Sequence, residues 1–379
     1  MRVIVSVIND LSSDQRVDKV CTSLASAGFQ VTLVGRRQRS SSVLIPRKYP
    51  MRRMFLFFEK GPAFYLFFQI RLFLFLIFRR AGLLVANDLD TLLPTYLAAR
   101  MKGIPFVYDT HELFCEVPEL LANPAKRKIW KNLERFLFPR ANAVFTVNQS
   151  IAGIYEQEYG RQLVVLRNVP RKSALKTGEL KSRSELGIPE GKKIILLQGS
   201  GINIQRGAEE AVEAMADVEN AILLVIGNGD VIPVLKKMCM HLNLESKVIF
   251  IPRIPFQELR HYTGLADIGL SLDKDTNLNY RYSLPNKIFD YIHAGVPVLA
   301  SDLPEVKQII LGYGVGCISP DHNPSHIASL LNEKLADSGL MKVWKENTKL
   351  AAEKLCWEEE EAELIRVYRK YQERPPGSS

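Results

Sequence analysis

The feature of the sequence that most constrains the fold is an alternation of short apolar runs with longer amphipathic runs, found in both halves of the chain. In the first half, the short runs predict strands and the runs between them predict helices. Strand–helix alternation is typical of a parallel sheet with helices on both faces. We expect strands at residues 3–8, 30–35, 83–88, 105–112, 143–148 and 163–168, and helices at 14–28, 89–102, 124–138 and 149–159.

The second half of the chain begins the same alternation again. A chain of 379 residues is also longer than one hydrophobic core usually holds. The expected fold class is therefore α/β, with two doubly wound domains that face each other across a cleft. We expect strands at residues 193–199, 221–227, 247–252, 268–272 and 296–301, helices at 207–217, 231–242 and 256–265, and a short helix between Pro285 and Gly295.

The domain limits follow from a polar stretch in the middle of the chain. Residues 170–191, PRKSALKTGELKSRSELGIPEG, are basic and rich in turn-forming residues, as linkers between domains usually are. Residues 341–371 predict one long charged helix. We expect a first domain at 1–170, a hinge at 171–191 with a short helix at 181–186, a second domain at 192–345, and a C-terminal helix and tail at 346–379 that cross back to the first domain.

The positive charge of the chain is unevenly distributed. The formal net charge is +9, and basic residues gather in one segment, where Glu59 is the one acid among them. Such a segment attracts nucleic acid, anionic lipid or a charged substrate, or it is a solvated loop. No nucleic-acid-binding motif accompanies it, so we expect no nucleic acid partner. The basic residues are Arg36, Arg37, Arg39, Arg47, Lys48, Arg52, Arg53 and Lys60.

Residues 62–78, PAFYLFFQIRLFLFLIF, form the longest apolar run. Gln69 and Arg71 interrupt it, and it is short for a membrane span of about 20 residues. It predicts either a buried helix or a helix that lies on a bilayer surface. Because the basic segment precedes it, we expect residues 36–80 to make peripheral contact with an anionic membrane.

Cysteine spacing and the N-terminal residues bear on the compartment. The five cysteines include no CxxC pair, which predicts a reduced, cytosolic chain with neither a disulfide framework nor a metal site. The start, MRVIVSVIND, is too briefly apolar for a signal peptide and is expected to form a strand. We therefore expect a cytoplasmic protein, at the inner face of the cell membrane where it is peripheral.

The loops that follow strands are where a doubly wound sheet binds its ligands. Residues 199–207, GSGINIQRG, follow one predicted strand, and Gly227 ends the next. Glycine allows the backbone to approach a phosphate closely, and helix N-termini attract anions. These features predict a phosphate site that includes Gly199, Gly201 and Arg206, with an ordinary tight turn as the alternative.

Residues 283–301, SLPNKIFDYIHAGVPVLAS, carry the stronger signal. Ser283, Lys287 and Asp290 share one helical face at i, i+4 and i+7. A cation in the first turn of a helix opposes the helix dipole, which is reasonable if an anion lies between them. We expect a diphosphate at Lys287 and a ribose diol at Asp290. The alternative is an exposed Lys–Asp pair that contributes little.

The segment PNKIFDYIHAGVPVLAS resembles the donor-binding signature of family 4 retaining glycosyltransferases, whose GT-B fold consists of two Rossmann-like domains. The resemblance covers most of the chain, because other segments also match that family. They are NDLSSDQRVDKVCTSLASAGFQVTLVG, ANDLDTLLPTYLAAR, VYDTHELFCEVPEL, AVFTVNQSIAGIYEQEYG and LRNVP.

The resemblance implies a nucleotide-diphosphate sugar donor, a UDP-, GDP- or similar nucleotide-sugar, that is held mainly by the second domain. By this resemblance, Arg206 and Lys287 would bind the diphosphate and stabilise it as it leaves. Asp290 would bind the ribose, and Ile254 would lie beside the base. His111 would lie near the transferred sugar, and its alternative role is a loop histidine bonded to the backbone. The implied catalytic residues are His111, Arg206 and Lys287, and the implied donor-binding residues are Gly199, Gly201, Arg206, Gly227, Ile254, Ser283, Leu284, Asn286, Lys287 and Asp290.

Two departures from the family pattern concern the same site. The family has two acidic residues with seven between them, but Tyr282 stands where the first is expected. Ser283 and Asn286 are candidates to replace its contacts with sugar hydroxyls. Ser200 stands where a phosphate-binding arginine is common, which leaves more of that task to Arg206. The implied mechanism is front-face retention without a metal ion, a cofactor or a protein nucleophile.

The acceptor is expected to contact polar residues that follow strands of the first domain, although turn chemistry explains Asn and Asp in loops as well. The acceptor-side candidates are Asn9, Asp10, Asp14, Arg16, Asp88 and Asp90.

The function expected from these features is a retaining hexosyl-type glycosyltransferase. It would act on a glycan or lipid-linked acceptor in bacterial cell-surface polysaccharide synthesis. The alternatives are a non-catalytic nucleotide-binding GT-B relic, which Tyr282 favours, and a nucleotide-sugar epimerase of similar fold. A dehydrogenase is disfavoured, because the first strand ends in VINDLSS rather than in a G-x-G-x-x-G loop.

Overall fold

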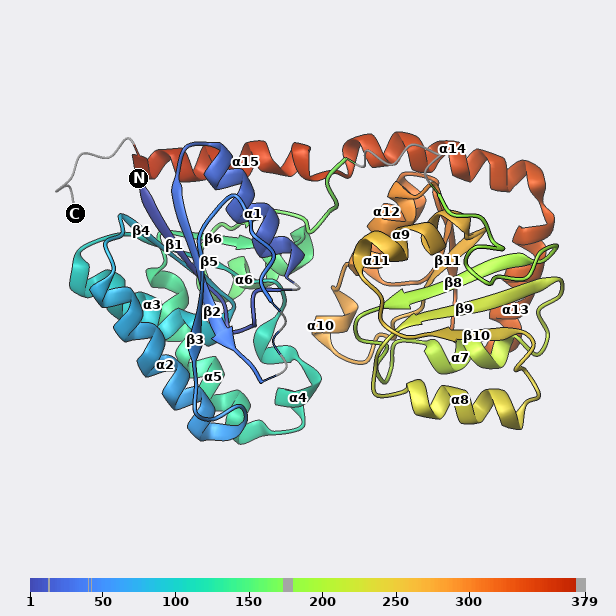
Figure 1. Ribbon diagram of the computed structural model, residues 1–379, viewed down its shortest axis with the longest axis horizontal. Coiled ribbons are helices and arrows are strands. Elements are labelled where there is room, and N and C mark those ends of the chain that lie inside the picture. The colour runs from blue at the N-terminus through green and yellow to red at the C-terminus, as the bar shows by residue number, and fades with distance from the viewer. Residues whose placement is uncertain (13, 40, 42, 173–179, 373–379) are drawn as a thin grey trace. The chain divides into compact units, whose positions relative to one another are not determined.

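The computed structural model describes residues 1–12, 14–39, 41, 43–172 and 180–372. The chain divides into two compact units (Figure 1). Unit 1 comprises Met1–Asn168 together with Trp357–Ser379, and unit 2 comprises Val169–Cys356. Each unit is an α/β fold built on one parallel sheet, which confirms the predicted fold class.

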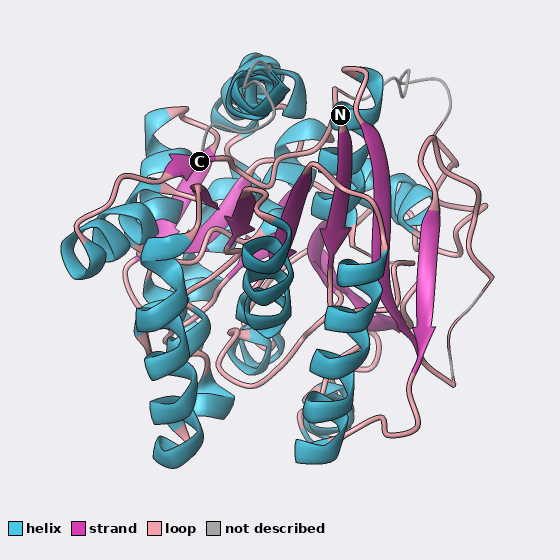
Figure 2. Ribbon diagram, turned by 90° about the vertical axis from the view of Figure 1, so that its left-hand side faces the viewer, coloured by secondary structure: helices cyan, strands magenta, loops and turns pink. Residues whose placement is uncertain are grey.

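Unit 1 contains a seven-stranded sheet in the order β3-β2-β1-β4-β5-β6-β7, and neighbouring strands pair in parallel. Figure 2, in which unit 1 faces the viewer, shows helices packed around these strands. The strands are β1 (Arg2–Ser6), β2 (Gln30–Arg37), β3 (Met51–Phe55), β4 (Leu83–Asn87), β5 (Phe106–Asp109), β6 (Ala143–Thr146) and β7 (Val164–Val165). The α-helices are α1 (Gln15–Ser26), α2 (Gly61–Phe78), α3 (Leu89–Lys102), α4 (Pro118–Leu121), α5 (Pro124–Leu137), α6 (Gln149–Tyr159) and α15 (Trp357–Gln372).

Unit 2 contains a six-stranded parallel sheet in the order β10-β9-β8-β11-β12-β13. The strands are β8 (Lys193–Gly199), β9 (Ala221–Gly227), β10 (Val248–Ile251), β11 (Ile268–Ser271), β12 (Val298–Ser301) and β13 (Gly316–Ser319). The helices are α7 (Ala208–Ala214), α8 (Ile232–His241), α9 (Phe256–Leu265), α10 (Leu278–Arg281), α11 (Asn286–His293), α12 (Pro304–Gly312), α13 (Pro324–Ala336) and α14 (Ser338–Lys354).

The strands of unit 2 are apolar on both faces because a helical layer covers each face. Successive side chains of a strand point to opposite faces. In β8, Ile195 and Leu197 belong to one core cluster, with α7, α8 and α13. Ile194 and Leu196 belong to the other, with α9, α11 and α12. This double coverage explains why the central strands were readily predicted from uninterrupted apolar runs.

The C-terminal helix α15 completes the core of unit 1. Trp357 is fully buried, and its indole Nε1 donates a hydrogen bond to Ser23 Oγ over 2.8 Å. Tyr368 stacks on Phe145 with ring centroids 5.9 Å apart. Glu360 accepts from the backbone N–H of Arg167 over 2.9 Å. These contacts tie residues from the two ends of the chain into one core.

The predicted single helix at residues 341–371 is wrong. Helix α14 ends at Lys354, and α15 starts at Trp357. Leu355 is buried in a core cluster of unit 2, whereas Trp357 is buried in that of unit 1. The helix breaks there because two residues that are only two positions apart pack into different cores. Unit 2 therefore extends to Cys356, beyond the predicted limit of 345.

The predicted hinge at residues 171–191 is described by the structure only in part, and that part contains no helix. Residues 173–179 lie outside the described residues. The predicted helix at 181–186 is wrong, because these residues form turns. The carboxylate of Glu185 accepts from both the backbone N–H and the hydroxyl of Ser182, at 2.7 Å each. Such local side-chain bonds favour a turn over a continuing helix.

Strand β3 was not predicted, because it lies inside the basic segment. Its residues are MRRMF, and Met54 is the buried one among them. It pairs with β2 from Leu33↔Met51 to Arg37↔Phe55. The sheet therefore extends by one strand where the charge pattern had indicated a loop.

We expect Trp357→Ala to lower the free energy of unfolding by about 3–5 kcal/mol, because it removes a large buried side chain and the partner of Ser23. Chemical denaturation followed by circular dichroism measures the loss. Trp130→Ala is the matched control, since the indole of Trp130 is half-buried at an aromatic surface cluster. Equal losses for the two variants would contradict the role of α15 in the core.

Candidate functional site

The strand order of unit 2 reverses between β8 and β11, which are neighbours in the sheet. Ligands of doubly wound sheets bind beside such a reversal, at the carboxyl ends of the strands. The loops after β8 and β11 lie against each other there. At Gly207, where φ is +70°, an added Cβ would lie 2.2 Å from the carbonyl oxygen of Leu272. Only glycine permits this close approach of the two loops.

The other glycines of this region fall into two kinds. A Cβ at Gly227 would lie 1.8 Å from the carbonyl oxygen of Gly199, so Gly227 is required by packing between the strand ends. A Cβ at Gly199 or Gly201 would meet only ordinary contacts, at 3.7 Å and 3.5 Å. The packing within the chain therefore explains Gly227 but not Gly199 or Gly201.

Two cationic side chains converge on one carboxylate at this place. Arg206 Nη1 lies 2.8 Å from Asp273 Oδ1, and Lys287 Nζ lies 3.1 Å from Asp273 Oδ2. Asp273 follows β11 and is 1% exposed. Arg206 and Lys287 are the two residues that the resemblance implies for the diphosphate. They lie close together in the structure although they are 81 positions apart in the sequence.

The charges of this cluster do not cancel. Burial alone would raise the pKa of Asp273, but Lys287 and Arg206 outweigh burial and lower it, so the carboxylate is ionised. Two cations beside one carboxylate leave one net positive charge. Arg206 also lies over the ring of Tyr280, with its guanidinium carbon 4.8 Å from the ring centroid. We infer that the cluster attracts an anion.

Helix α11 holds Lys287 in its first turn. The N-cap position is Pro285, which has no side-chain acceptor, and α11 starts at Asn286. The apolar residues on the inner side of the helix anchor it. Tyr291 is fully buried, and its hydroxyl donates to the carbonyl of Leu196 over 3.0 Å. The helix start is therefore held rigidly, with Lys287 beside its unsatisfied N–H groups.

The remaining predicted donor-side residues have different surroundings. Ser283 precedes α11 and does not cap it, because its hydroxyl donates to the carbonyl of Tyr280 over 2.9 Å. Ile254 and Leu284 are half-buried against the core, and Asn286 is exposed. The carboxylate of Asp290 raises the pKa of Arg260 against the larger effect of burial, which lowers that pKa.

Asp273 and Tyr280 are the site residues that the sequence analysis missed. Asp273 immediately follows the predicted strand at 268–272. A polar residue at the carboxyl end of a parallel strand is the signal that could have found it. Tyr280 lies on α10, a one-turn helix that was not predicted.

In unit 1 the strand order reverses between β1 and β4. Three acceptor-side candidates hold the loop after β1 together. Asn9 Nδ2 donates to Asp14 Oδ2 over 2.8 Å, and Asp14 caps α1 by accepting from the N–H of Val17. Asp10 lies 3.7 Å from the guanidinium of Arg53. These bonds are the turn chemistry named as the alternative, and they give the loop one defined shape.

Arg16 is buried in an ion pair within unit 1, and its predicted contact with an acceptor stays a prediction. The side chain is 2% exposed. Its Nε and Nη2 donate to the two oxygens of Asp109 at 3.1 Å and 2.8 Å, and Nη1 donates to the carbonyl of Leu166 over 2.6 Å. The pair fixes α1 to the end of β5, where it orients Asp109.

His111 lies between two carboxylates beside this pair. Its Nδ1 is 3.4 Å from Asp88 Oδ2, and its Nε2 is 3.8 Å from Asp109 Oδ2. Within the described part of the chain, Nε2 has no hydrogen-bond partner. Burial lowers the pKa of His111, but Asp88 and Asp109 outweigh burial and raise it. The ring nitrogens therefore face carboxylates rather than backbone atoms, and the imidazole is readily protonated.

Asp90, another acceptor-side candidate, is 7% exposed. Burial, together with Asp88 and Glu112, raises the pKa of Asp90 to about 7. The backbone carbonyl of Asp90 accepts from Gln69 Nε2 of α2 over 2.5 Å. Asp90 therefore connects the first turn of α3 to the apolar helix α2.

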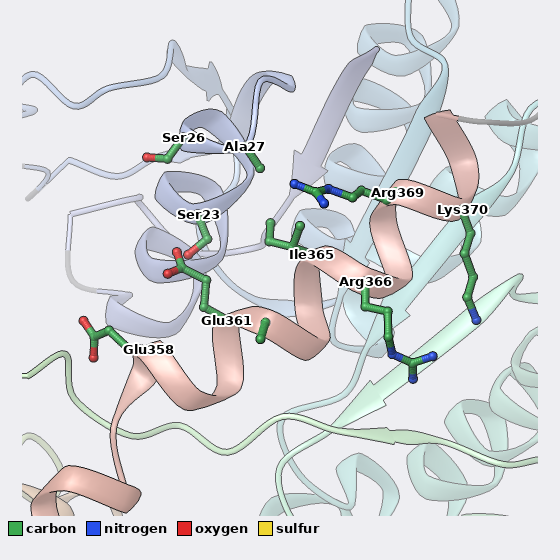
Figure 3. Close-up of a pocket in the computed structure, with 10 residues that line it drawn as sticks. Ser23, Ser26, Ala27, Glu358, Glu361, Ile365, Arg366, Arg369 and Lys370 are labelled. Carbon is green, nitrogen blue, oxygen red and sulfur yellow. The ribbon is translucent and has the colours of Figure 1, made fainter.

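A pocket of about 790 Å³ lies between α1 and α15 of unit 1. Figure 3 shows Glu358 and Glu361 toward one end and Arg366, Arg369 and Lys370 toward the other. None of the predicted site residues lines this pocket. Among the described residues, no group of three His, Cys, Asp or Glu side chains is placed to hold a metal ion.

We expect Asp273→Asn to lower the free energy of unfolding by about 2 kcal/mol at pH 7. This is less than for a fully buried pair, because Arg206 is partly exposed. The pKa of Asp273 is lowered in the folded state, so its contribution is present above about pH 4 and is lost as the pH falls through the folded pKa. Thermal unfolding against pH measures this. Asp302→Asn, which breaks an exposed pair with Lys307, is the control. Equal effects of the two variants would contradict a stabilising role for the pairs of Asp273 with Arg206 and Lys287.

The imidazole of His111 is expected to titrate with a midpoint above the ordinary value of about 6.5. Its contribution to stability is therefore present below about pH 6.5 and is lost as the pH rises through the raised pKa. NMR titration of the ring measures the midpoint. Asp88→Asn should lower it and Asp302→Asn should not. A wild-type midpoint at or below 6.5 would show that the carboxylates do not act on the ring.

Both halves of the chain match known protein families. Residues 14–169 match the model described as Glycosyltransferase Family 4, and residues 179–351 match the model described as Glycosyl transferases group 1. An uncharacterized glycosyltransferase of Methanocaldococcus jannaschii is 26% identical over 191 residues, which are 49% of this chain and 47% of that protein. The alpha-monoglucosyldiacylglycerol synthase of Streptococcus pneumoniae is 32% identical over 134 residues, 34% of this chain and 28% of that protein. The chain thus spans about half, or less, of the length of these relatives.

Solved structures of similar fold cover nearly the whole chain. The sucrose-phosphate synthase of Thermosynechococcus elongatus has a TM-score of 0.81 and 16% identity, covering 98% of both chains. HepE of Anabaena in complex with UDP-glucose has a TM-score of 0.78 and 14% identity, covering 98% of this chain and 100% of that one. Together with the two family models and the two parallel sheets, these similarities lead to one conclusion: the chain belongs to the family 4 glycosyltransferases, with the GT-B fold.

Proposed function

We propose that this chain transfers a hexose from a nucleotide-diphosphate sugar to a glycan or lipid-linked acceptor, with retention of configuration. The observation that carries the proposal is the shared carboxylate of Arg206 and Lys287 at the start of α11. This cluster carries one net positive charge and lies at the strand-order reversal of unit 2. A diphosphate is the anion that fits two adjacent cations and a helix N-terminus.

The proposed chemistry follows from where charge develops. As the bond between sugar and phosphate breaks, negative charge grows on the departing diphosphate and the sugar becomes oxocarbenium-like. Cations and N–H groups that are already in place lower this barrier, because they need no reorganisation during the reaction. Asp273 positions both cations, and a metal ion is not required for the charge stabilisation. The acceptor hydroxyl attacks from the face that the diphosphate leaves.

The donor is proposed to bind through unit 2. Asp290, one turn beyond Lys287, accepts hydrogen bonds from the ribose diol. Ile254 and the loop at Gly227 lie at the strand ends where the base is expected. The solved complex of Anabaena HepE with UDP-glucose, similar in fold, supports a nucleotide-sugar of this class. Gly199 and Gly201, which packing within the chain leaves unexplained, would allow the donor to approach the backbone closely.

The acceptor side is proposed to lie in unit 1. The side chain of His111 is partly exposed in the loop between β5 and α4, and Asp88 and Asp109 raise its pKa, which favours the protonated ring. A protonated imidazole is a hydrogen-bond donor that suits a sugar hydroxyl or a phosphate oxygen. Similarity to a diacylglycerol-modifying enzyme supports a lipid acceptor. We assign the activity to the cytoplasm, in the synthesis of bacterial cell-surface polysaccharide.

A second candidate is a GT-B protein that binds a nucleotide without turnover. Tyr282 favours it, because a tyrosine cannot replace the acidic residue that contacts sugar hydroxyls in the family. Tyr282 ends α10 and comes just before Ser283 in the loop to α11. Release of free nucleotide in the presence of acceptor separates this candidate from the transferase.

Lys287→Ala is expected to abolish the thermal stabilisation by the donor and to lower kcat/KM by about 10²–10³-fold, because it removes a cation from the leaving group. A thermal-shift screen against UDP-, GDP- and ADP-sugars identifies the donor, and nucleotide release measures turnover. Lys307→Ala is the matched control, since Lys307 forms an exposed pair elsewhere in unit 2. Full transfer by Lys287→Ala would overturn the assignment, and donor binding without turnover by any acceptor would support the second candidate.

A further inference from the structure

We propose that unit 1 docks on an anionic lipid bilayer through the outer face of α2 and the aromatic turn before it. The membrane then presents the acceptor to the enzyme. This inference rests on the proposed function and deepens it, since it names the physical form of the acceptor.

Helix α2 carries two apolar stripes on opposite faces. Phe64, Phe68, Leu72 and Leu76 are buried in unit 1. Two positions further along, Leu66, Ile70, Leu74 and Phe78 are between 43% and 82% exposed. At 3.6 residues per turn, a shift of two positions is a rotation of about 200°. The inner stripe explains why α2 packs on the fold, and the outer stripe has no such explanation.

The contacts of the inner face exclude a spanning role for α2. Among the described residues it is the one helix long and apolar enough to cross a membrane, with a mean hydropathy of 1.7. Yet Gln69 bonds to Asp90 of α3, and Lys102 Nζ donates to the carbonyls of Leu76 and Ile77 at 2.8 Å and 3.1 Å. Figure 1 shows α2 and α3 side by side. At about 27 Å long, α2 is also slightly shorter than a hydrocarbon core of about 30 Å.

Aromatic side chains extend the outer stripe at the N-terminal end of α2. Phe55, Phe57 and Phe58 are more than half exposed. Phe57 meets Phe55 and Phe67 edge to face, at centroid distances of 5.2 Å and 5.4 Å, and Phe58 meets Phe67 at 6.3 Å. Exposed phenylalanines held together in this way form an apolar patch suited to the acyl boundary of a bilayer.

The charge around the patch selects an anionic lipid surface over a second copy of the chain. Residues 51–80 contain six Lys or Arg and one acid, Glu59. Lys60, Arg71, Arg79 and Arg80 are exposed. Two copies facing each other through this patch would bring like charges together, whereas anionic headgroups would pair with them.

Helix α2, which carries the patch, contacts the segment that holds two acceptor-side candidates, Asp88 and Asp90. Gln69, in the middle of α2, bonds to the carbonyl of Asp90, two residues after Asp88, which contacts His111. Docking of α2 would therefore bring the carboxyl ends of β4 and β5 to the lipid surface. An acceptor that is carried by a lipid could reach His111 without leaving the membrane.

The test is co-sedimentation with vesicles of phosphatidylcholine alone and of phosphatidylcholine with phosphatidylglycerol, at low and at high salt. The wild-type chain is expected to bind the anionic vesicles and to be released by salt. The triple variant Leu66→Ser, Ile70→Ser, Leu74→Ser should bind the anionic vesicles at least about tenfold more weakly than the wild type. The variant Lys60→Gln, Arg80→Gln should lose about fivefold for each cation removed.

Matched controls come from unit 2. Leu311→Ser, Val343→Ser, Leu350→Ser removes apolar side chains of similar exposure, and Lys237→Gln, Lys342→Gln removes two exposed cations. Both controls should bind vesicles as the wild type does. Thermal unfolding should be unchanged in all four variants, since each altered side chain is exposed.

Several results would overturn the proposal. They are failure of the wild type to bind anionic vesicles at low salt, equal binding to neutral vesicles, and equal losses in the control variants. If light scattering shows that the wild type is a dimer and the triple variant a monomer, the patch is an interface with a second copy of the chain. Resistance to alkaline extraction from membranes would assign α2 to a span.

The proposed function is measured separately in the same variants. Stabilisation by nucleotide-sugars and transfer to a water-soluble acceptor should be unchanged in the triple variant, whereas transfer to an acceptor in vesicles should fall with vesicle binding. If donor stabilisation is absent in the wild type while vesicles still bind, the proposed function fails and the docking surface stands. If transfer to vesicle acceptors persists without vesicle binding, the docking inference fails and the function stands.

Discussion

The carboxylate of Asp273 is the constraint on which the candidate site depends. Arg206 comes from the loop before α7 and Lys287 from the first turn of α11, so without a shared partner their charges would repel each other. The carboxylate draws both side chains to the end of β11. It compensates only one of the two charges, and the remaining charge is available to a ligand. A single buried acid thus keeps a binding site both assembled and positive.

The same principle, a buried charge that orients other charges, recurs in unit 1. Arg16 fixes Asp109, and Asp109 together with Asp88 surrounds the ring of His111. In both units these charges gather where the strand order reverses. The Rossmann-like topology supplies the position, because neighbouring strands there direct their following loops to opposite sides and leave room between them. The side chains then decide which sign of charge the position favours.

Much of the fold could be predicted from the sequence, because strands covered on both faces are continuously apolar. The bounds of β8 and β9 were predicted at every residue for this reason. Strand β3 was missed because it contains two arginines and lies at the edge of the sheet, with Met54 as its one buried residue. The break between α14 and α15 was missed because no proline or glycine marks it, and the packing of Leu355 and Trp357 in separate cores causes it. Likewise, the position of Arg16 at the start of α1 could not reveal its pairing with Asp109, 93 residues away.

The placement of α15 bears on how the chain reaches its folded state during synthesis. Every segment of unit 2 has been made once Cys356 has been added, whereas unit 1 still lacks Trp357 and Tyr368 at that moment. The core of unit 1 therefore stays incomplete until residues that follow unit 2 in the sequence have been made. The unit whose first residues are made earlier thus completes its core later, when α15 is added.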